Sequence, residues 1–255
     1  MKRKLTIGTR KSALALWQAE YIKKALEGYD PELTVTLEHI VTKGDKILDV
    51  PLARIGGKGL FTTELESRLL AGTIDLAVHS LKDLPADLPD GLCLAAVTAR
   101  SHVHDAFVSN RYAALDALPQ GACVGTSSLR RRAQLLARRP DLTVRDLRGN
   151  VDTRLKKLDD GEYDAIILAE AGLTRLGLTD RITQLLPTDT MIPAVGQGAL
   201  AIETRADDDD LKQALSFLCD EETTAATTAE RTFLAAINGS CQVPVGVYGK
   251  AKDGQ

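Results

Sequence analysis

The chain has 255 residues, of which 44% are hydrophobic and 4% aromatic, and its formal net charge is −3. This length and apolar content suffice for a buried core and about two domains, with room for a small third. A negative net charge with few aromatic side chains argues against a nucleic-acid binder, and no apolar stretch approaches the ~18 residues that a membrane helix needs.

The amino-terminal residues lack the continuous apolar segment of a secretion signal, so we expect a cytoplasmic protein. Strand-length apolar runs then alternate with segments of helical period. Strands are predicted at residues 5–8, 33–41 and 74–78, and helices at about 13–26 and 61–70. The alternation resumes after residues 105–108, with strands at 122–125, 142–144 and 165–168 and helices at 129–138 and about 151–158. This order predicts an α/β fold with two similar lobes.

A faint internal repeat supports the two lobes. Ile7-Gly8-Thr9 resembles Val124-Gly125-Thr126, and a hydroxyl-bearing helix start follows each of them. Both copies would aim backbone N–H groups at the carboxyl ends of their strands, so we expect the site in a cleft between the lobes.

The glycine-rich residues 193–203 are predicted to return the chain to the first lobe. Helices are expected near residues 210–219 and 223–237, and a strand at 243–248. The predicted domains are residues 1–99 with 194–216, residues 100–193, and a small α+β unit at 217–255.

An arginine cluster marks the second lobe. Residues 125–154 hold three acidic residues, no lysine and eight arginines: Arg130, Arg131, Arg132, Arg138, Arg139, Arg145, Arg148 and Arg154. A solvated basic helix face would explain such a run of charges. Arginine also pairs bidentately with carboxylate or phosphate and keeps its charge, so the cluster together with the capped helix start favours an anionic partner.

Two segments of the first lobe carry candidate chemistry. Residues 55–61 are glycine-rich but lack the complete phosphate-loop pattern; Lys58 there belongs either to a loop over the cleft or to a surface connection. Residues 79–85 place Lys82 and Asp83 at the carboxyl end of a strand, as a surface ion pair or as groups of the site. His79 is interpreted as a packing or hydrogen-bonded histidine.

The cysteines are far apart and match neither a disulfide scaffold nor a zinc site, so we expect no metal. Cys93, Cys123 and Cys219 lie in or beside apolar or helical patterns and are interpreted as structural. Cys241, between a helix end and a predicted strand, is either a structural cysteine or a nucleophile or attachment point.

Six motifs in this order resemble the porphobilinogen deaminase (hydroxymethylbilane synthase) family over nearly the whole chain. They are Gly8-Thr9-Arg10 with the run from Ser12 to Ala19, Gly56-Gly57-Lys58-Gly59-Leu60-Phe61, His79-Ser80-Leu81-Lys82-Asp83, Gly125-Thr126-Ser127-Ser128-Leu129-Arg130-Arg131, Leu147-Arg148-Gly149-Asn150, and Gly239-Ser240-Cys241-Gln242-Val243-Pro244.

The resemblance implies two periplasmic-binding-protein-like lobes around a cleft and a third domain with a cofactor-attachment loop. Family members continue several tens of residues past the equivalent of Gln255, so we expect the third domain to be incomplete. The implied activity is a transferase reaction in porphyrin (haem) biosynthesis. Four porphobilinogen molecules condense stepwise, with loss of ammonia, to the linear tetrapyrrole hydroxymethylbilane. The implied protein is a monomer with neither a nucleic-acid nor a membrane partner.

The resemblance also implies roles for individual residues. Cys241 would hold a dipyrromethane cofactor through a thioether, and Asp83 would be the catalytic carboxylate that stabilises the cation left when ammonia departs. Cofactor carboxylates would be bound by Ser12, Lys82, Thr126, Ser128, Arg130, Arg131 and Arg148. Arg10, Arg154 and Lys58 would bind substrate, and Gln197 would belong to the hinge. Two alternatives remain open, an inactive fragment and a two-lobed anion-binding module without catalysis.

Overall fold

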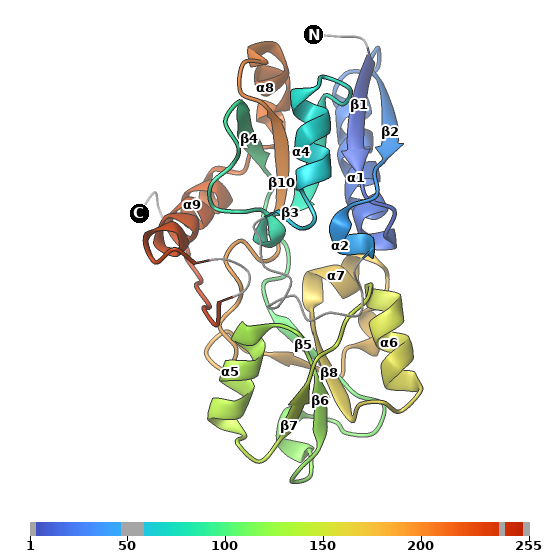
Figure 1. The fold of residues 1–255 in the computed structure, drawn as a ribbon, viewed down its shortest axis with the longest axis vertical. Coiled ribbons are helices and arrows are strands. Elements are labelled where there is room, and N and C mark those ends of the chain that lie inside the picture. Colours follow the sequence, from blue (N-terminus) through green and yellow to red (C-terminus); the bar gives the residue numbers. More distant parts are fainter. Residues whose placement is uncertain (1–3, 47–58, 240–242, 252–255) are drawn as a thin grey trace.

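The computed structural model describes residues 4–46, 59–239 and 243–251. Two α/β lobes lie one above the other along the long axis of the molecule, and the helix α9 (Glu221–Ala236) lies to one side of them (Figure 1). Each lobe is built around a five-stranded sheet.

The first lobe has the strand order β2-β1-β3-β10-β4. The strands are β1 (Lys4–Thr9), β2 (Thr34–His39), β3 (Leu76–Ser80), β4 (Leu92–Val97) and β10 (Leu200–Arg205). β1 is parallel to β2 and β3, whereas β10 runs antiparallel to both of its neighbours. The helices are α1 (Ala13–Tyr29), α2 (Lys43–Lys46), α4 (Thr63–Leu70) and α8 (Asp209–Leu215), followed by the 3-10 turn Ser216–Leu218.

The second lobe repeats this topology in the order β7-β6-β8-β5-β9. The strands are β5 (Asp105–Val108), β6 (Cys123–Gly125), β7 (Thr143–Arg145), β8 (Ala165–Ala169) and β9 (Gln184–Leu186). The helices are α5 (Leu129–Arg138), α6 (Val151–Asp159) and α7 (Glu170–Arg175). Again three neighbouring strands, β7, β6 and β8, are parallel, and the strand that enters from the other lobe, β5, is antiparallel to both of its neighbours.

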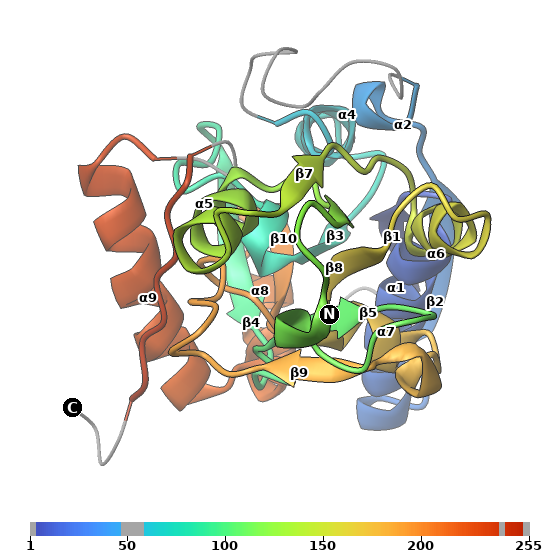
Figure 2. The same ribbon diagram turned by 90° about the horizontal axis from the view of Figure 1, so that it is seen from below.

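Each sheet is covered on both faces, which explains why its central strands are apolar throughout. In the first lobe, Ile22 of α1 and Leu211 of α8 share one core, and Leu65 of α4 belongs to another. In the second lobe, Leu135 of α5 and Leu155 of α6 lie in separate cores. Figure 2 shows the two sheets end-on with their helices around them.

The repeat predicted from Gly8 and Gly125 is present in the packing. A Cβ atom at Gly8 would come 2.3 Å from Cδ1 of Ile74, and one at Gly125 would come 2.8 Å from Cδ1 of Tyr163. Both positions therefore need glycine, because the neighbouring side chain fills the place of a Cβ atom.

The predicted strand at 243–248 is wrong. Residues 245–250 have no regular structure, and Val247 donates one backbone hydrogen bond, to the carbonyl of Pro193. The apolar alternation suggested a strand, but within the described part of the chain this segment has no strand beside it to complete a ladder. The helix expected at 210–219 is also shorter than predicted, because α8 ends at Leu215 and a 3-10 turn replaces its last turn.

The helix α9 forms polar contacts with both segments that cross between the lobes. The Glu230 carboxylate pairs with Arg100 in the first crossing (Oε1–Nη1 2.7 Å) and accepts from the Gly196 N–H in the second. Arg231 donates to the carbonyls of Leu84, Pro85 and Ala86, directly after the 3-10 turn Leu81–Asp83. The helix therefore supports the hinge and the loop after Asp83 together.

Candidate functional site between the lobes

Both lobes present a serine-capped helix at the ends of their parallel strands. The Ser12 hydroxyl accepts a hydrogen bond from the Ala15 N–H at the start of α1, and the Ser128 hydroxyl accepts from the Arg131 N–H at the start of α5. Thr126 is buried, and its hydroxyl accepts from the Ser128 N–H. The predicted helix starts are thus confirmed, and their positive dipole ends face the region between the lobes.

A small cavity opens at the end of the first lobe. Its volume is about 60 Å³, and its lining includes Arg10, Ser12, His79, Ser80 and Asp83. Asp83 is exposed at the end of the 3-10 turn that follows β3. The structure therefore brings three of the predicted site residues, Arg10, Ser12 and Asp83, to one place.

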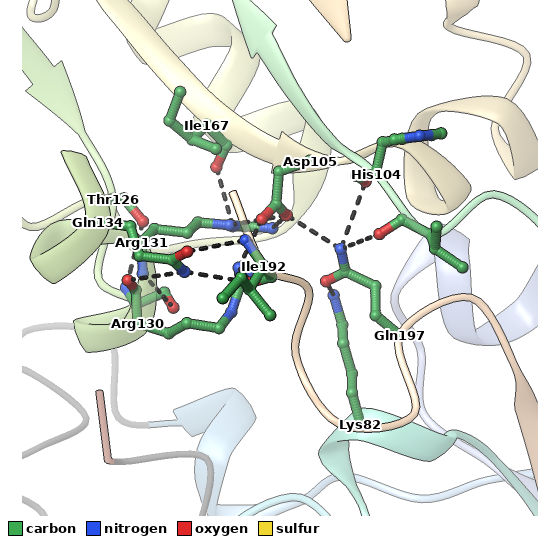
Figure 3. Close-up of polar contacts among 12 residues, drawn as sticks. Lys82, His104, Asp105, Thr126, Arg130, Arg131, Gln134, Ile167, Ile192 and Gln197 are labelled. Carbon is green, nitrogen blue, oxygen red and sulfur yellow. Dashed lines mark hydrogen bonds and ion pairs between the residues drawn. The ribbon is translucent and has the colours of Figure 1, made fainter. Parts of the chain in front are cut away.

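Lys82 connects this turn to the hinge. Its Nζ lies 3.3 Å from Oε1 of the buried Gln197, whose amide nitrogen donates to the carbonyl of Val103 (Figure 3). Burial lowers the pKa of Lys82 to about 8, although the neighbouring Asp83 charge opposes the change; the charge of Arg131 lowers the pKa further. The charges that act on Lys82 thus come from both lobes, Asp83 from the first and Arg131 from the second.

A buried carboxylate, Asp105, holds the first two arginines of α5 (Figure 3). Its Oδ2 is 2.7 Å from Nη1 of Arg130, and its Oδ1 is 2.6 Å from Nη2 of Arg131. Arg130 also donates to the carbonyl of Ile192, and Arg131 to that of Ile167. Burial alone would raise the pKa of Asp105, but the two arginine charges and their hydrogen bonds hold it well below its usual range.

Sequence reasoning missed Asp105. It proposed Arg130 and Arg131 as partners of ligand carboxylates, and the structure shows that both also pair with a carboxylate of the protein. The available signal was an acidic residue at the start of the apolar strand β5, where a charge needs a buried partner.

Arg148 and Arg154 add positive charge beside this pair. Arg154 donates to the carbonyl of Gly149 at 2.7 Å. Burial lowers the pKa of Arg154 to about 10; the charges of Arg131 and Arg148 lower it too, and that of Asp83 raises it. Burial also lowers the pKa of Arg148. The charged groups that act on Arg154 thus include Asp83, which belongs to the other lobe.

Arg10 is the arginine of the first lobe among the predicted site residues. Its Nε lies 3.1 Å from Oδ1 of Asp45, and its guanidinium stacks 4.2 Å from the centre of the Phe61 ring. Of the remaining predicted site residues, Lys58 and Cys241 lie outside the residues that the structure describes.

The other arginines of the cluster have partners within the second lobe. Arg138 pairs with Asp116, Arg139 pairs with Asp141, and Arg145 lies over the ring of Tyr163. Each of these three arginines therefore has a contact within the protein. Arg132 is exposed on α5.

Sequence reasoning also missed Arg175, at the end of α7. It donates to the carbonyl of Gly198 in the hinge at 2.8 Å and lies 5.8 Å from the centre of the Trp17 ring on α1. Burial lowers its pKa to about 10. No local pattern marks this arginine, because its partners are brought together only by the fold.

The chemistry of these groups suits a ligand with several carboxylates. Arg130 and Arg131 share one buried carboxylate, Asp105, and the buried Nε of Arg130 has no hydrogen-bond partner among the described residues. Arginine forks and helix N-termini both bind carboxylates through N–H donors. The residues present therefore fit an organic ligand that carries several carboxylates.

The fold is that of a two-lobed protein of the periplasmic-binding-protein type. A periplasmic substrate-binding protein of an ABC transporter from Coxiella burnetii matches with a TM-score of 0.54 and 15% identity, over 89% of this chain and 96% of its own. A nutrient-binding protein from Burkholderia cenocepacia bound to methionine matches with a TM-score of 0.51 and 14% identity, over 92% and 96%. The periplasmic VFT2 domain of BvgS from Bordetella pertussis gives 0.51 and 13%, over 92% and 93%. At these identities the likeness concerns the fold.

Two family models identify the chain more closely. The model described as porphobilinogen deaminase, dipyromethane cofactor binding domain, matches residues 5–213, and the porphobilinogen deaminase C-terminal domain matches residues 224–255. The chain belongs to the porphobilinogen deaminase family, and it contains the domain that binds the dipyrromethane cofactor.

No helix in the described part of the chain has the length and apolar character needed to cross a membrane.

Proposed function

We propose that this protein condenses four porphobilinogen molecules, with loss of ammonia, to hydroxymethylbilane. Family membership supports this reaction. The structural observation that carries the proposal is the exposed Asp83 carboxylate, which lines the cavity of the first lobe. Its negative charge also acts on Arg154 of the other lobe. The acetate and propionate groups of a pyrrole substrate are opposite in charge to the arginines. A cation formed on the pyrrole is opposite in charge to the Asp83 carboxylate.

The proposed roles follow from position. Arg148, Arg154, Arg131 and the helix starts at Ser12 and Ser128 bind carboxylates and orient the pyrroles. When bound, the dipyrromethane supplies the free pyrrole carbon that is extended, and by the resemblance Cys241 holds it. The Asp83 carboxylate stabilises the positive charge that develops on the substrate as ammonia leaves.

Lys82 and Gln197 position this carboxylate. Lys82 directly precedes Asp83 in the same 3-10 turn and contacts Gln197, which also donates to Asp105. The hinge and the turn that carries Asp83 therefore share one hydrogen-bonded network. A change in the angle between the lobes would alter the position of Asp83.

Substitution of Asp83 tests the proposal. We expect Asp83→Asn to keep its cofactor but to lose turnover by about 100-fold or more, measured as ammonia release from porphobilinogen, because the amide cannot balance a cation. Asp90→Asn, an exposed acidic residue of the following loop, is the control and keeps full activity. Full activity in Asp83→Asn would remove Asp83 from the reaction.

A second candidate is a two-lobed module that binds the anion without turning it over, which the fold of the binding proteins above favours. Ammonia release by the wild-type protein decides between the two. We further propose that the protein works in the cytoplasm as a monomer on porphobilinogen, without nucleic-acid or membrane partners.

A further inference from the structure

His79 and Glu203 form a buried hydrogen-bonded pair next to the site. They lie on the adjacent antiparallel strands β3 and β10, with His79 Nε2 2.9 Å from Glu203 Oε2. The side chain of His79 is 6% exposed and that of Glu203 is 0% exposed. An ionised carboxylate only accepts hydrogen bonds, so Nε2 carries the hydrogen and Nδ1 is the nitrogen left for another partner.

His79 also faces the place where Asp83 lies. Both residues are among those that line the cavity of about 60 Å³ at the end of the first lobe, together with Ser80 and Arg10. Such a volume holds a few water molecules. The pair therefore connects the cavity with a carboxylate in the interior.

Glu203 differs from the buried carboxylate that holds the hinge. Both oxygens of Glu230 accept hydrogen bonds, from Arg100 and from the backbone N–H groups of Gly196 and Gly249. In contrast, Oε1 of Glu203 has no hydrogen-bond partner among the described residues. A buried carboxylate left partly unsatisfied costs stability, so a purely structural role explains Glu230 better than Glu203.

Other charged groups surround the pair. Glu66 on α4 faces it; burial raises the pKa of Glu66, the charge of Glu203 raises it further, and that of His79 lowers it. Asp83 and Arg10 face His79 across the cavity. The pair thus lies between one buried carboxyl group and the exposed carboxylate of the site.

We propose that His79, oriented by Glu203, accepts the proton that the pyrrole α-carbon loses in each coupling step, a role that rests on the proposed function. The C–H bond breaks, its electron pair returns to the pyrrole ring, and an N–H bond forms at Nδ1. Glu203 stabilises the resulting imidazolium, as the acidic residue does in a serine–histidine–acid triad. The proton then passes to the ammonia released from the next porphobilinogen, which leaves as ammonium, and His79 is neutral again. Asp83 stays ionised throughout beside the substrate cation.

The test uses porphobilinogen that carries deuterium on its free α-carbon. In His79→Gln, kcat falls about 10- to 100-fold with KM within about twofold, because the amide cannot take the proton. The deuterium effect on kcat becomes larger than in the wild type, since C–H cleavage now limits the rate. Intact mass and thermal unfolding confirm that the variant is loaded and folded, and His79→Asn replaces it where the glutamine variant does not fold.

The matched control is His104→Gln. His104 makes the same type of pair, with Nδ1 3.0 Å from Oε2 of Glu170, but does not line the cavity. We expect its kcat and deuterium effect to equal those of the wild type. A readout independent of turnover is the ¹⁵N spectrum of histidine-labelled protein: Nε2 of His79 carries the hydrogen in the wild type, and this tautomer preference is lost in Glu203→Gln.

An unchanged kcat and deuterium effect in His79→Gln, with an active wild type, overturns the proposal and leaves the proposed function intact. So does an equal change in His104→Gln. A wild type that releases no ammonia contradicts the proposed function itself, and this inference with it.

Discussion

The two lobes share a backbone device but differ in the charges they attach to it. Each ends a parallel strand in glycine and threonine and begins a helix at a capping serine, Ser12 in one and Ser128 in the other. In the first lobe the site carries the exposed Asp83 and a single arginine, Arg10, held by Asp45. In the second lobe the corresponding helix carries arginines that reach the buried Asp105.

The difference separates binding from chemistry. The second lobe supplies fixed positive charge, which suits anions that must be held through several cycles. The first lobe supplies groups that can respond to a developing cation or take a proton, namely Asp83 and His79. In the proposed function, a repeated fold thus carries two chemical functions through a few side chains at equivalent strand ends.

Substitution of Asp105 is expected to destabilise the second lobe. Asp105→Asn leaves two buried guanidinium groups facing an amide, and we expect a loss of about 3–5 kcal/mol in the free energy of unfolding, measured by urea denaturation. Asp116→Asn is the control, because its partner Arg138 is on the surface, and its denaturation midpoint stays unchanged. Similar losses in both variants would mean that the buried pair is not what organises this lobe.

Arg148 and Arg139 test the division of the arginine cluster. Arg148→Leu should raise KM for porphobilinogen or reduce cofactor loading by roughly 10- to 100-fold, because a charged hydrogen-bond donor to carboxylate is removed. Arg139→Leu removes an arginine that pairs with Asp141, and its KM and loading remain those of the wild type. Both are read from kinetics and intact mass. Equal effects would show that the two arginines have been assigned wrongly.

Lys82 gives a smaller effect that depends on pH. Its pKa of about 8 means that it is charged below pH 8 and loses the charge as the pH rises through that value. We expect KM of the wild type to rise about fivefold more between pH 7 and pH 9 than that of Lys82→Arg, because the arginine stays charged. The ratio of the two proteins at each pH removes the titration of the substrate. An identical pH dependence in both would exclude Lys82 from binding.

Local patterns predicted an element well where the spacing of apolar residues along that element was enough to identify it. The helix expected at 129–138 has those bounds in the structure. Helix starts at Ser12 and Ser128 followed from capping chemistry that acts within three residues. The roles of Arg148, Lys82 and Cys241 came from the family resemblance and stay predictions.

Contacts between distant segments were not predictable from the sequence. Asp105 pairs with Arg130 and Arg131, and His79 pairs with Glu203 far along the chain, so neither pair leaves a pattern within one window. The segment at 243–248 shows the opposite error, since an apolar alternation does not form a strand where no neighbouring strand is available.

The most direct test of the central claim is the intact mass of the purified protein. If the protein is a porphobilinogen deaminase that holds its primer through Cys241, the wild type expressed with ample porphobilinogen weighs more than its sequence by two pyrrole units. Cys241→Ser shows no such excess. An unmodified wild-type mass, or an excess that survives in Cys241→Ser, would contradict the account.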